Sequence, residues 1–389
     1  MNRAGMNMET VKIRNRSLIL KFINDHGPVS RKELAAATGL TPASVTQITM
    51  QLISEDLLTE LGAVKEPIGR AGRREVLLDI RTDSFLVLSV NIEPEETTAA
   101  VCNMKGEIVR GNEKEDLLVC FPTERDVLPV TFLQTVADRA EDLLTALPEE
   151  KREHVGGISV GITGIVDSVN GVSKRAYGIW KAEVPVREIL EQELGLPVTI
   201  ENNVDAFAIA ELLFGTGRSH DDLLIIKWGP GVGSAIVLND SVYRGRHGKT
   251  AELGHFIVDP NGRTCSCGRK GCLETKVSYR ALHEILNFTP DTFEEAFVQA
   301  KGLQRGRLDE AIAMFARCIV NAGSLIAPKR IVLCGPLFAG EKVRRALIDK
   351  CSSFDPAYHD RRILHTALEG KERYIGPAAV YIQNKISGI

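Results

Sequence analysis

The segment CSCGRKGCLE, Cys265 to Glu274, restricts the fold of this chain more than any other. It places three cysteines within eight positions, and His255 lies ten positions before the first of them. One histidine and three cysteines form a ligand set of closed, tetrahedral zinc sites. Gly268 and Gly271 allow the tight turns that such a loop needs. Reduced loop thiols are the alternative, but loose cysteines rarely cluster in this way. The expected ligands of a structural zinc ion are His255, Cys265, Cys267 and Cys272.

Length and composition indicate a protein with more than one domain. The 389 residues are 44% hydrophobic and 25% charged, which suffices for two or three cores. No apolar run approaches the ~20 residues of a membrane helix, and the N-terminus lacks the apolar stretch of a signal peptide. Five further cysteines are scattered along the chain, a pattern that does not suggest disulfides. We therefore expect a cytoplasmic protein that does not associate with membranes.

The first 80 residues have the pattern of three helices followed by a hairpin. Apolar residues recur at helical spacing over 11–26. Ser30 with Glu33 forms a capping box that begins a second helix, and Thr41 with Pro42 begins a third. Two short helices joined by a turn of about four residues are what a helix-turn-helix needs to place one helix in the major groove. A packing or oligomerisation module is the alternative.

The third helix and the hairpin carry the residues that we expect to contact DNA. Strands at 57–61 and 75–79 flank a loop rich in glycine and arginine, and such a wing suits a narrow minor groove or phosphates. A solvated loop is the alternative. Residues 1–80 have a net charge of only +2, from 11 Lys and Arg against 9 Asp and Glu, so binding should need two copies. The expected DNA contacts are Ser44, Thr46, Gln47, Arg70, Arg73 and Arg74.

From residue 81 onward the pattern is that of a two-lobed α/β domain. The first set of elements consists of strands at 85–92, 97–103, 107–110 and 155–161 and a helix at 131–146. A second set begins near Val198 and consists of a helix at 204–214 and strands at 223–228 and 234–238. This near repetition predicts two lobes with a cleft between them, where ligands tend to bind.

Four motifs in this region resemble the ROK family, whose name joins repressor, open reading frame and kinase. They are ENN at Glu201–Asn203, GPGVGSAIVLNDSVYRG at Gly229–Gly245, AELGH at Ala251–His255, and the cysteine segment. The winged helix ahead of them resembles the repressor branch of the family. The resemblance covers essentially the whole chain and implies an actin-like, hexokinase-like fold in two lobes.

The resemblance implies three domains. These are a winged helix-turn-helix over 1–80, a first α/β lobe over 81–197, and a second α/β lobe over 198–375 with the zinc loop at 255–274. A C-terminal helix at about 376–389 is expected to pack back on the first lobe.

The resemblance also implies a monosaccharide site in the cleft. Family kinases hold the sugar hydroxyls with an Asn-Asp pair, the Glu and His of an ExGH segment, and the Glu that closes the CLE segment. The Glu and Asn side chains would accept hydroxyl hydrogens, and the histidine nitrogen that zinc leaves free would donate to a hydroxyl. Surface charge is the alternative for the two glutamates. Tyr177 could stack on a sugar ring or simply pack. The matching positions here are Asn202, Asn203, Glu252, His255 and Glu274.

Departures from the family pattern argue against phosphotransfer. Family kinases have an aspartate at Asn203 that takes the proton from the attacking sugar hydroxyl, and a carboxamide cannot accept it. Loss of a general base costs on the order of 10²- to 10⁴-fold in rate. A DxGGT phosphate loop is replaced by NIEPEE at 91–96, where Pro94 removes a donor and three carboxylates would repel a triphosphate. We expect no bound ATP and no catalytic residue.

The leading hypothesis is a sugar-responsive repressor of carbohydrate-utilisation genes. It would bind operator DNA as a homodimer or dimer of dimers and respond to a monosaccharide effector. The alternative is an active ATP-dependent sugar kinase of the same family with an attached DNA-binding domain. A third possibility is a repressor whose signal is a partner protein.

Overall fold

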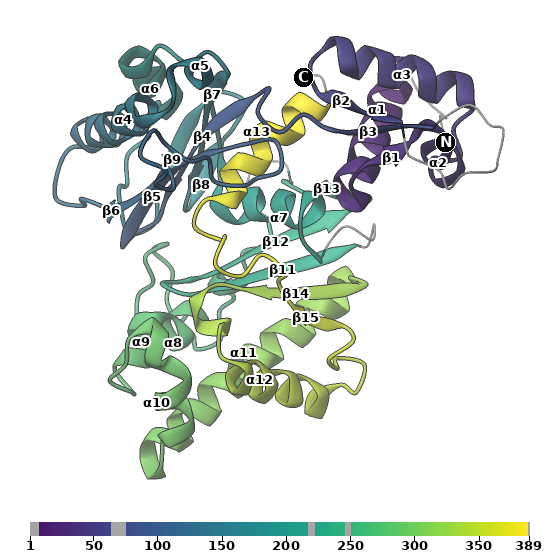
Figure 1. Cartoon of the computed structure of the whole chain (residues 1–389). Helices are drawn as coiled ribbons and strands as arrows, with labels where there is room; N and C mark the ends of the chain where they lie inside the picture. The colour runs from purple at the N-terminus through teal and green to yellow at the C-terminus, as the bar shows by residue number, and fades with distance from the viewer. Residues whose placement is uncertain (1–7, 64–74, 217–221, 246–249, 388–389) are drawn as a thin grey trace.

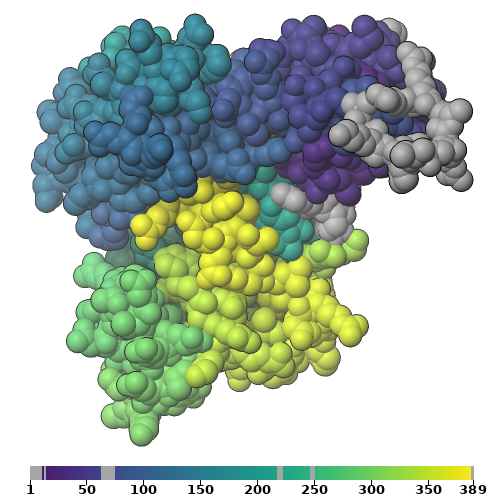
Figure 2. All heavy atoms as spheres, viewed as in Figure 1, coloured from purple at the N-terminus to yellow at the C-terminus, as the bar shows by residue number. Residues whose placement is uncertain are grey.

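Figure 1 shows the computed structural model of the chain, which describes residues 8–63, 75–216, 222–245 and 250–387. The chain forms an N-terminal module (residues 8–80) and two lobes, each built on a five-stranded sheet. In the space-filling view the purple N-terminal module adjoins the blue first lobe, and the green second lobe projects away from both (Figure 2). No helix among the described residues is long and apolar enough to cross a bilayer.

The N-terminal module contains three helices and a three-stranded antiparallel sheet of order β1-β3-β2. The capping box is present: Ser30 N–H donates to Glu33 Oε2 at 2.7 Å, and Glu33 N–H donates to Ser30 Oγ at 3.3 Å. Thr41 Oγ1 accepts from Ser44 N–H at 3.2 Å and begins the third helix. The predicted helices and hairpin strands are thus confirmed. The elements are α1 (Met8–His26), β1 (Val29–Ser30), α2 (Arg31–Thr38), α3 (Pro42–Ser54), β2 (Leu58–Ala63) and β3 (Val76–Ile80).

The first lobe has a mixed sheet of order β10-β7-β4-β5-β6, whose central strands are almost fully buried. Helices α4 and α6 pack against each other beside it. The strands are β4 (Leu86–Ile92), β5 (Glu96–Cys102), β6 (Leu118–Pro122), β7 (Val155–Ile162) and β10 (Val198–Asn202). The helices are α4 (Pro129–Ala146), α5 (Glu149–Arg152) and α6 (Val186–Leu194), and β8 (Ile165–Asp167) with β9 (Val172–Arg175) forms a separate hairpin.

Two expectations about this lobe are wrong. The segment 107–110 is not a strand and makes only isolated bridges, such as Cys102 to Ile108, because β6 takes over the pairing of β5 and Val101 N–H already donates to Leu117 O. The strand from Val198 does not begin the second lobe, because it pairs in parallel with β7 at the edge of the first sheet. Local sequence does not reveal such long-range parallel pairing.

The second lobe has a sheet of order β13-β12-β11-β14-β15. Its core centres on Trp228, whose ring contacts those of Phe293, Phe315 and Phe338. The strands are β11 (Leu223–Trp228), β12 (Val232–Leu238), β13 (Ser241–Val242), β14 (Arg330–Cys334) and β15 (Ile363–His365). The helical elements are η2 (Leu253–His255), α8 (Glu274–Val277), α9 (Tyr279–His283), η3 (Pro290–Thr292), α10 (Phe293–Gln299), α11 (Gly302–Ile326), η4 (Pro336–Phe338) and α12 (Glu341–Phe354).

Two helices at the centre of Figure 1 connect the three parts, α7 (Asn203–Leu213) and α13 (Ile375–Ser387). Helix α13 packs against α7, β4 and β7, and also against α1 of the N-terminal module. Asn24 Nδ2 on α1 donates to Leu213 O at 2.9 Å, and Arg16 Nε donates to Ile386 O at 2.9 Å. The apolar core of the N-terminal module is therefore continuous with that of α7 and α13.

Candidate functional site

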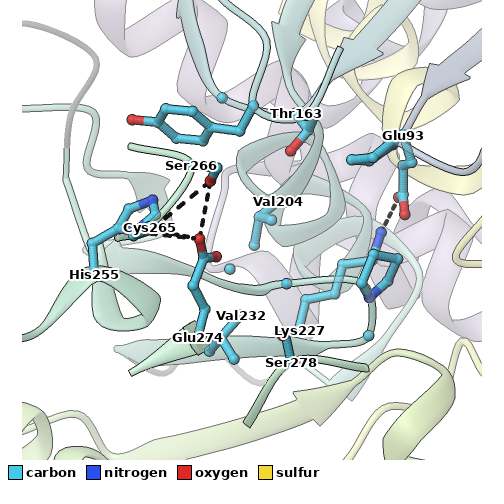
Figure 3. A pocket seen from close by; sticks show the side chains of 18 of the residues that line it. Glu93, Thr163, Val204, Lys227, Val232, His255, Cys265, Ser266, Glu274 and Ser278 are labelled. Atoms are coloured by element: carbon cyan, nitrogen blue, oxygen red, sulfur yellow. Dashed lines mark hydrogen bonds and ion pairs between the residues drawn. The ribbon is translucent and has the colours of Figure 1, made fainter. Parts of the chain in front are cut away.

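A cavity of about 430 Å³ lies between the two lobes. The first lobe contributes Glu93, Thr163 and Tyr177, and the second contributes Lys227 and the turn at 229–234. Figure 3 shows Glu93 and Thr163 of the first lobe and Lys227 of the second lobe around this cavity. The cavity is also lined by all five residues that the sequence selected for a sugar: Asn202, Asn203, Glu252, His255 and Glu274.

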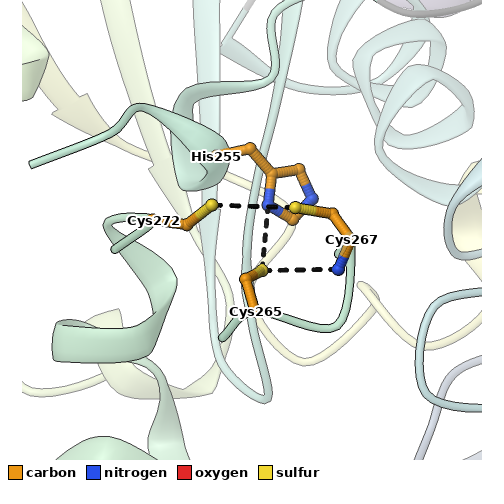
Figure 4. A group of neighbouring side chains, drawn as sticks. All are labelled: His255, Cys265, Cys267 and Cys272. Atoms are coloured by element: carbon orange, nitrogen blue, oxygen red, sulfur yellow. Dashed lines mark hydrogen bonds between the residues drawn. The ribbon is translucent and has the colours of Figure 1, made fainter. Parts of the chain in front are cut away.

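A cluster of four potential metal ligands borders this cavity. One donor atom each of His255, Cys265, Cys267 and Cys272 lies within 4.8 Å of every other (Figure 4). Cys267 Sγ lies 3.6 Å from Cys272 Sγ, and Cys265 Sγ lies 3.5 Å from His255 Nδ1. Two thiolates bound at 2.3 Å to one tetrahedral zinc are about 3.8 Å apart, so the donor set fits a metal ion of this kind.

The backbone of the loop explains how the cysteines converge. Cys265 N–H donates to Arg269 O at 2.7 Å, which closes the turn between the first two cysteines and the third. Gly271 has a φ of +68°, and a Cβ there would lie 1.5 Å from Asp259 O, so no other residue fits. Burial raises the pKa of Cys267, but hydrogen bonds from Arg269 outweigh it, and the pKa lies below the usual value of a thiol. Burial instead raises the pKa values of the neighbouring thiols, Cys265 and Cys272.

The two nitrogens of His255 face different partners. Nδ1 faces the sulfur of Cys265, whereas Nε2 lies 3.3 Å from Glu252 Oε2. The rings of Tyr177 and His255 form a T-shaped pair with 5.1 Å between their centroids. We expected the second nitrogen to reach a sugar hydroxyl directly. The structure instead directs it to Glu252, because the i, i+3 spacing places both side chains on one side of the short helix η2.

Asn202 fixes the junction between β10 and α7. Its Oδ1 accepts from Val204 N–H at 2.8 Å and from Asp205 N–H at 3.1 Å, and its Nδ2 donates to Gly164 O at 2.8 Å. We expected Asn202 to accept sugar hydroxyl hydrogens, but the helix cap already occupies both acceptor positions of its amide oxygen. The Asn202 amide can therefore offer a ligand the second N–H of Nδ2.

Glu274 and its neighbours close the metal side of the cavity. Glu274 Oε1 accepts from Cys265 Sγ at 2.8 Å and from Ser266 Oγ at 3.1 Å (Figure 3). The carbonyl of Ser266 accepts from Arg175 of the first lobe at 2.7 Å, and the Arg175 guanidinium lies over the Tyr177 ring. The loop with the cysteines therefore contacts both lobes.

Sequence reasoning missed two charged residues of the cavity, Lys227 and Asp205, and it did not foresee that Lys227 pairs with Glu93. Lys227 forms a buried ion pair with Glu93, and Asn203 Nδ2 donates to the same carboxylate at 3.2 Å. Burial alone would raise the pKa of Glu93, but the Lys227 ammonium holds it below the usual value. The signal for Lys227 was available, as a single lysine inside the apolar strand LLIIKW. Burial, with help from Glu201, raises the pKa of Asp205 to about 7.

The expected DNA-contacting residues are only partly described. Thr46 and Gln47 are exposed on α3, and Ser44 is half-buried beside Thr41. The exposed side chain of Met50 continues the surface of this helix. Arg70, Arg73 and Arg74 lie outside the described residues.

Comparison with known proteins places the chain in a family. The ROK family model matches residues 87–383, and the chain belongs to the ROK family. The xylose repressor of Caldicellulosiruptor bescii is 25% identical over 398 residues, which cover 96% of both chains. A crystal structure of a ROK family transcriptional regulator, a homologue of the E. coli MLC protein, is 25% identical with a TM-score of 0.76 and covers 97% of both chains.

A kinase of the same family shares the fold over a smaller part of the chain. The ROK family glucokinase of Streptomyces griseus, crystallised with glucose and AMPPNP, has a TM-score of 0.62 at 24% identity. The match covers 98% of the glucokinase but 76% of this chain, whereas the two regulators match nearly its full length.

Proposed function

We propose that this chain is a sugar-responsive transcriptional repressor without kinase activity. One observation carries the proposal: Asn203, at the position of the catalytic carboxylate in family kinases, donates its amide N–H to Glu93 at 3.2 Å. A carboxamide has no basic site that could remove a proton from a sugar hydroxyl. The match to a xylose repressor over 96% of both chains supports the same function.

The N-terminal module would be a winged helix-turn-helix that binds operator DNA. Helix α3 would enter the major groove with Thr46 and Gln47, which are exposed near its N-terminal end. The arginines at 70, 73 and 74 would contact phosphates or the minor groove. Because the module has little net charge, two copies in a homodimer would bind a palindromic site.

The interlobe cavity would hold a monosaccharide. Its volume of about 430 Å³ falls in the range of small-molecule sites, and the carboxylates of Glu252 and Glu274 face it as hydroxyl acceptors. The half-buried ring of Tyr177 offers an apolar face. A site of this kind rejects analogues that lack the paired hydroxyls.

Zinc is the metal that fits the cysteine cluster, because three thiols and one imidazole suit its preferred tetrahedral ligand set. Bound there, it would supply a rigid crosslink between the cysteine loop and His255. With Nδ1 bound to the metal, Nε2 would carry the ring hydrogen and donate it to Glu252, whose Oε2 lies 3.3 Å away. His255 would in this way hold Glu252 at a fixed angle for a sugar hydroxyl.

Helices α7 and α13 would carry the signal from the cavity to DNA. Helix α7 begins at Asn203, in the cavity, and ends at Leu213, whose carbonyl accepts from Asn24 of the N-terminal module. Helix α13 contacts Arg16 through Ile386, and Arg16 also forms an ion pair with Glu55, the C-terminal cap of α3. A shift of the lobes would therefore reach the helix proposed to read DNA.

Thermal unfolding with a panel of neutral monosaccharides tests the sugar site, because a ligand that binds the folded state raises its melting temperature. We expect at least one sugar to stabilise the wild type and to lose its effect in Glu252→Gln. The matched control is Glu295→Gln, an exposed glutamate on α10 outside the cavity lining. The proposal would be contradicted if no sugar raised the melting temperature. It would also be contradicted if the protein phosphorylated a sugar with ATP at typical enzyme rates of roughly 1–10³ per second.

A further inference from the structure

The end of the cavity opposite the cysteine loop holds a buried ion pair that joins the two lobes. Glu93 follows β4 in the first lobe, and Lys227 lies on β11 in the second. Figure 3 shows the two side chains meeting across the cavity. Their side chains are only 19% and 11% exposed.

Three side-chain donors converge on one oxygen of the Glu93 carboxylate. Oε1 accepts from Lys227 Nζ, from Asn91 Nδ2 at 3.0 Å and from Asn203 Nδ2 at 3.2 Å. The backbone of Glu93 is fixed as well, since its carbonyl accepts from Thr123 Oγ1 at 2.6 Å and its N–H donates to Glu96 O at 3.2 Å. An ammonium and two amide donors converging on one oxygen form an anion site.

The charge balance around Lys227 disfavours the binding of a second anion beside it. Glu93 is the first-lobe anion that Lys227 faces, and Glu372 lies near enough to Lys227 to favour its charged form too. Lys227 has one positive charge, which the buried Glu93 already neutralises. A ligand phosphate here would have to displace Glu93 and leave that carboxylate buried without its cation, which is strongly unfavourable.

We propose that Glu93 is an internal anion: it occupies the place that an anionic ligand would need at Lys227, ties the two lobes together, and restricts this end of the cavity to uncharged ligands. The inference goes beyond the proposed function, because it holds whatever molecule binds at the cysteine end. It also explains why Asn203 is an amide, since the site needs a donor to Glu93 at this position.

Glu93→Gln tests the proposal, because the amide keeps the shape of the side chain and removes the carboxylate that is hydrogen-bonded to the Lys227 ammonium, while Glu372 remains nearby. The probe is inorganic pyrophosphate, titrated by isothermal calorimetry into the full-length protein. We expect Glu93→Gln to bind it at least about tenfold more tightly than the wild type. The double variant Glu93→Gln/Lys227→Met should lose this gain, because it lacks the cation.

The matched control is Glu96→Gln, which removes one charge from the same turn but takes it from Arg373 rather than Lys227. The proposal would be overturned if Glu96→Gln raised the affinity for pyrophosphate as much as Glu93→Gln does, or if Glu93→Gln did not raise it. If a single variant does not fold because it buries an unpaired charge, the double variant, which buries none, should fold. Failure of the double variant alongside a folded single variant would equally contradict a charge-pairing role.

Discussion

Asn203→Asp restores the carboxylate of the family kinases, and we expect it to destabilise this protein rather than to confer activity. The new carboxylate would lie where Asn203 Nδ2 now donates to Glu93 Oε1 at 3.2 Å. Two negative charges at this separation repel by about 5 kcal/mol at an effective dielectric constant of about 20. Protonating an aspartate at pH 7 instead costs about 4 kcal/mol. The Lys227 ammonium attracts the new group as well, so we expect a net loss of about 2–4 kcal/mol.

The loss should depend on pH in a definite direction. The pKa of the new aspartate would be higher in the folded protein than in the unfolded chain, so both states are protonated at low pH and the penalty is absent. The stability penalty grows as the pH rises from about 4, the pKa of the aspartate in the unfolded chain, toward its pKa in the folded protein. Above the folded-state pKa the penalty is constant. Thermal unfolding should show a melting temperature lower by about 2–5 °C at pH 8 and a smaller decrease at pH 5.

Asn203→Ala is the control for this prediction, because it removes the same hydrogen bond without adding charge. Its cost should be about 1 kcal/mol and independent of pH. An Asn203→Asp variant as stable as the wild type at pH 8 would refute the assignment of Glu93 as a buried anion beside this position. Turnover of a sugar with ATP in that variant would show that the phosphate end of the cavity is intact.

Three further predictions concern the metal, the DNA and the link between them. Cys267→Ser should lower the metal content from one zinc per chain and abolish the thermal shift by sugar, while operator binding persists; elemental analysis showing no zinc in the wild type would exclude the site. Gln47→Ala should reduce discrimination between operator and random DNA by about 1–3 kcal/mol, measured by competition binding, and unchanged discrimination would remove Gln47 from the base contacts. Asn24→Ala, which breaks the contact with Leu213, should leave operator affinity intact but reduce its response to sugar several-fold, and a full response would place the coupling elsewhere.

Local features of the sequence were sufficient to predict the helices of the N-terminal module and the cluster of cysteines. The capping box of Ser30 and Glu33 acts within one turn of helix, so the residues that define it are adjacent in sequence. The cysteines of the loop likewise lie within eight positions. The ENN, AELGH and CLE segments, which the family resemblance selected, all contribute residues to the lining of the cavity.

Long-range partners were not predictable in the same way. Strand β10 looks like the start of a new lobe, but its parallel partner β7 lies about forty residues earlier. The amide of Asn202 was expected to be available to a sugar, and the α7 cap uses it. Lys227 stands out in its strand, but only the fold shows that Glu93 of the other lobe is its partner, 134 positions away.

In the proposed function, the binding of a sugar in the cavity changes the affinity of the N-terminal module for DNA. The most direct measurement takes a DNA site selected by the full-length protein from a random library and follows its binding by fluorescence anisotropy with each monosaccharide of a panel. We predict that one sugar shifts the DNA affinity by about 5–150-fold, with no requirement for ATP, and that Glu252→Gln abolishes the shift. A protein that selects no DNA sequence, or whose DNA affinity is unchanged by a sugar that demonstrably occupies the cavity, would contradict the account.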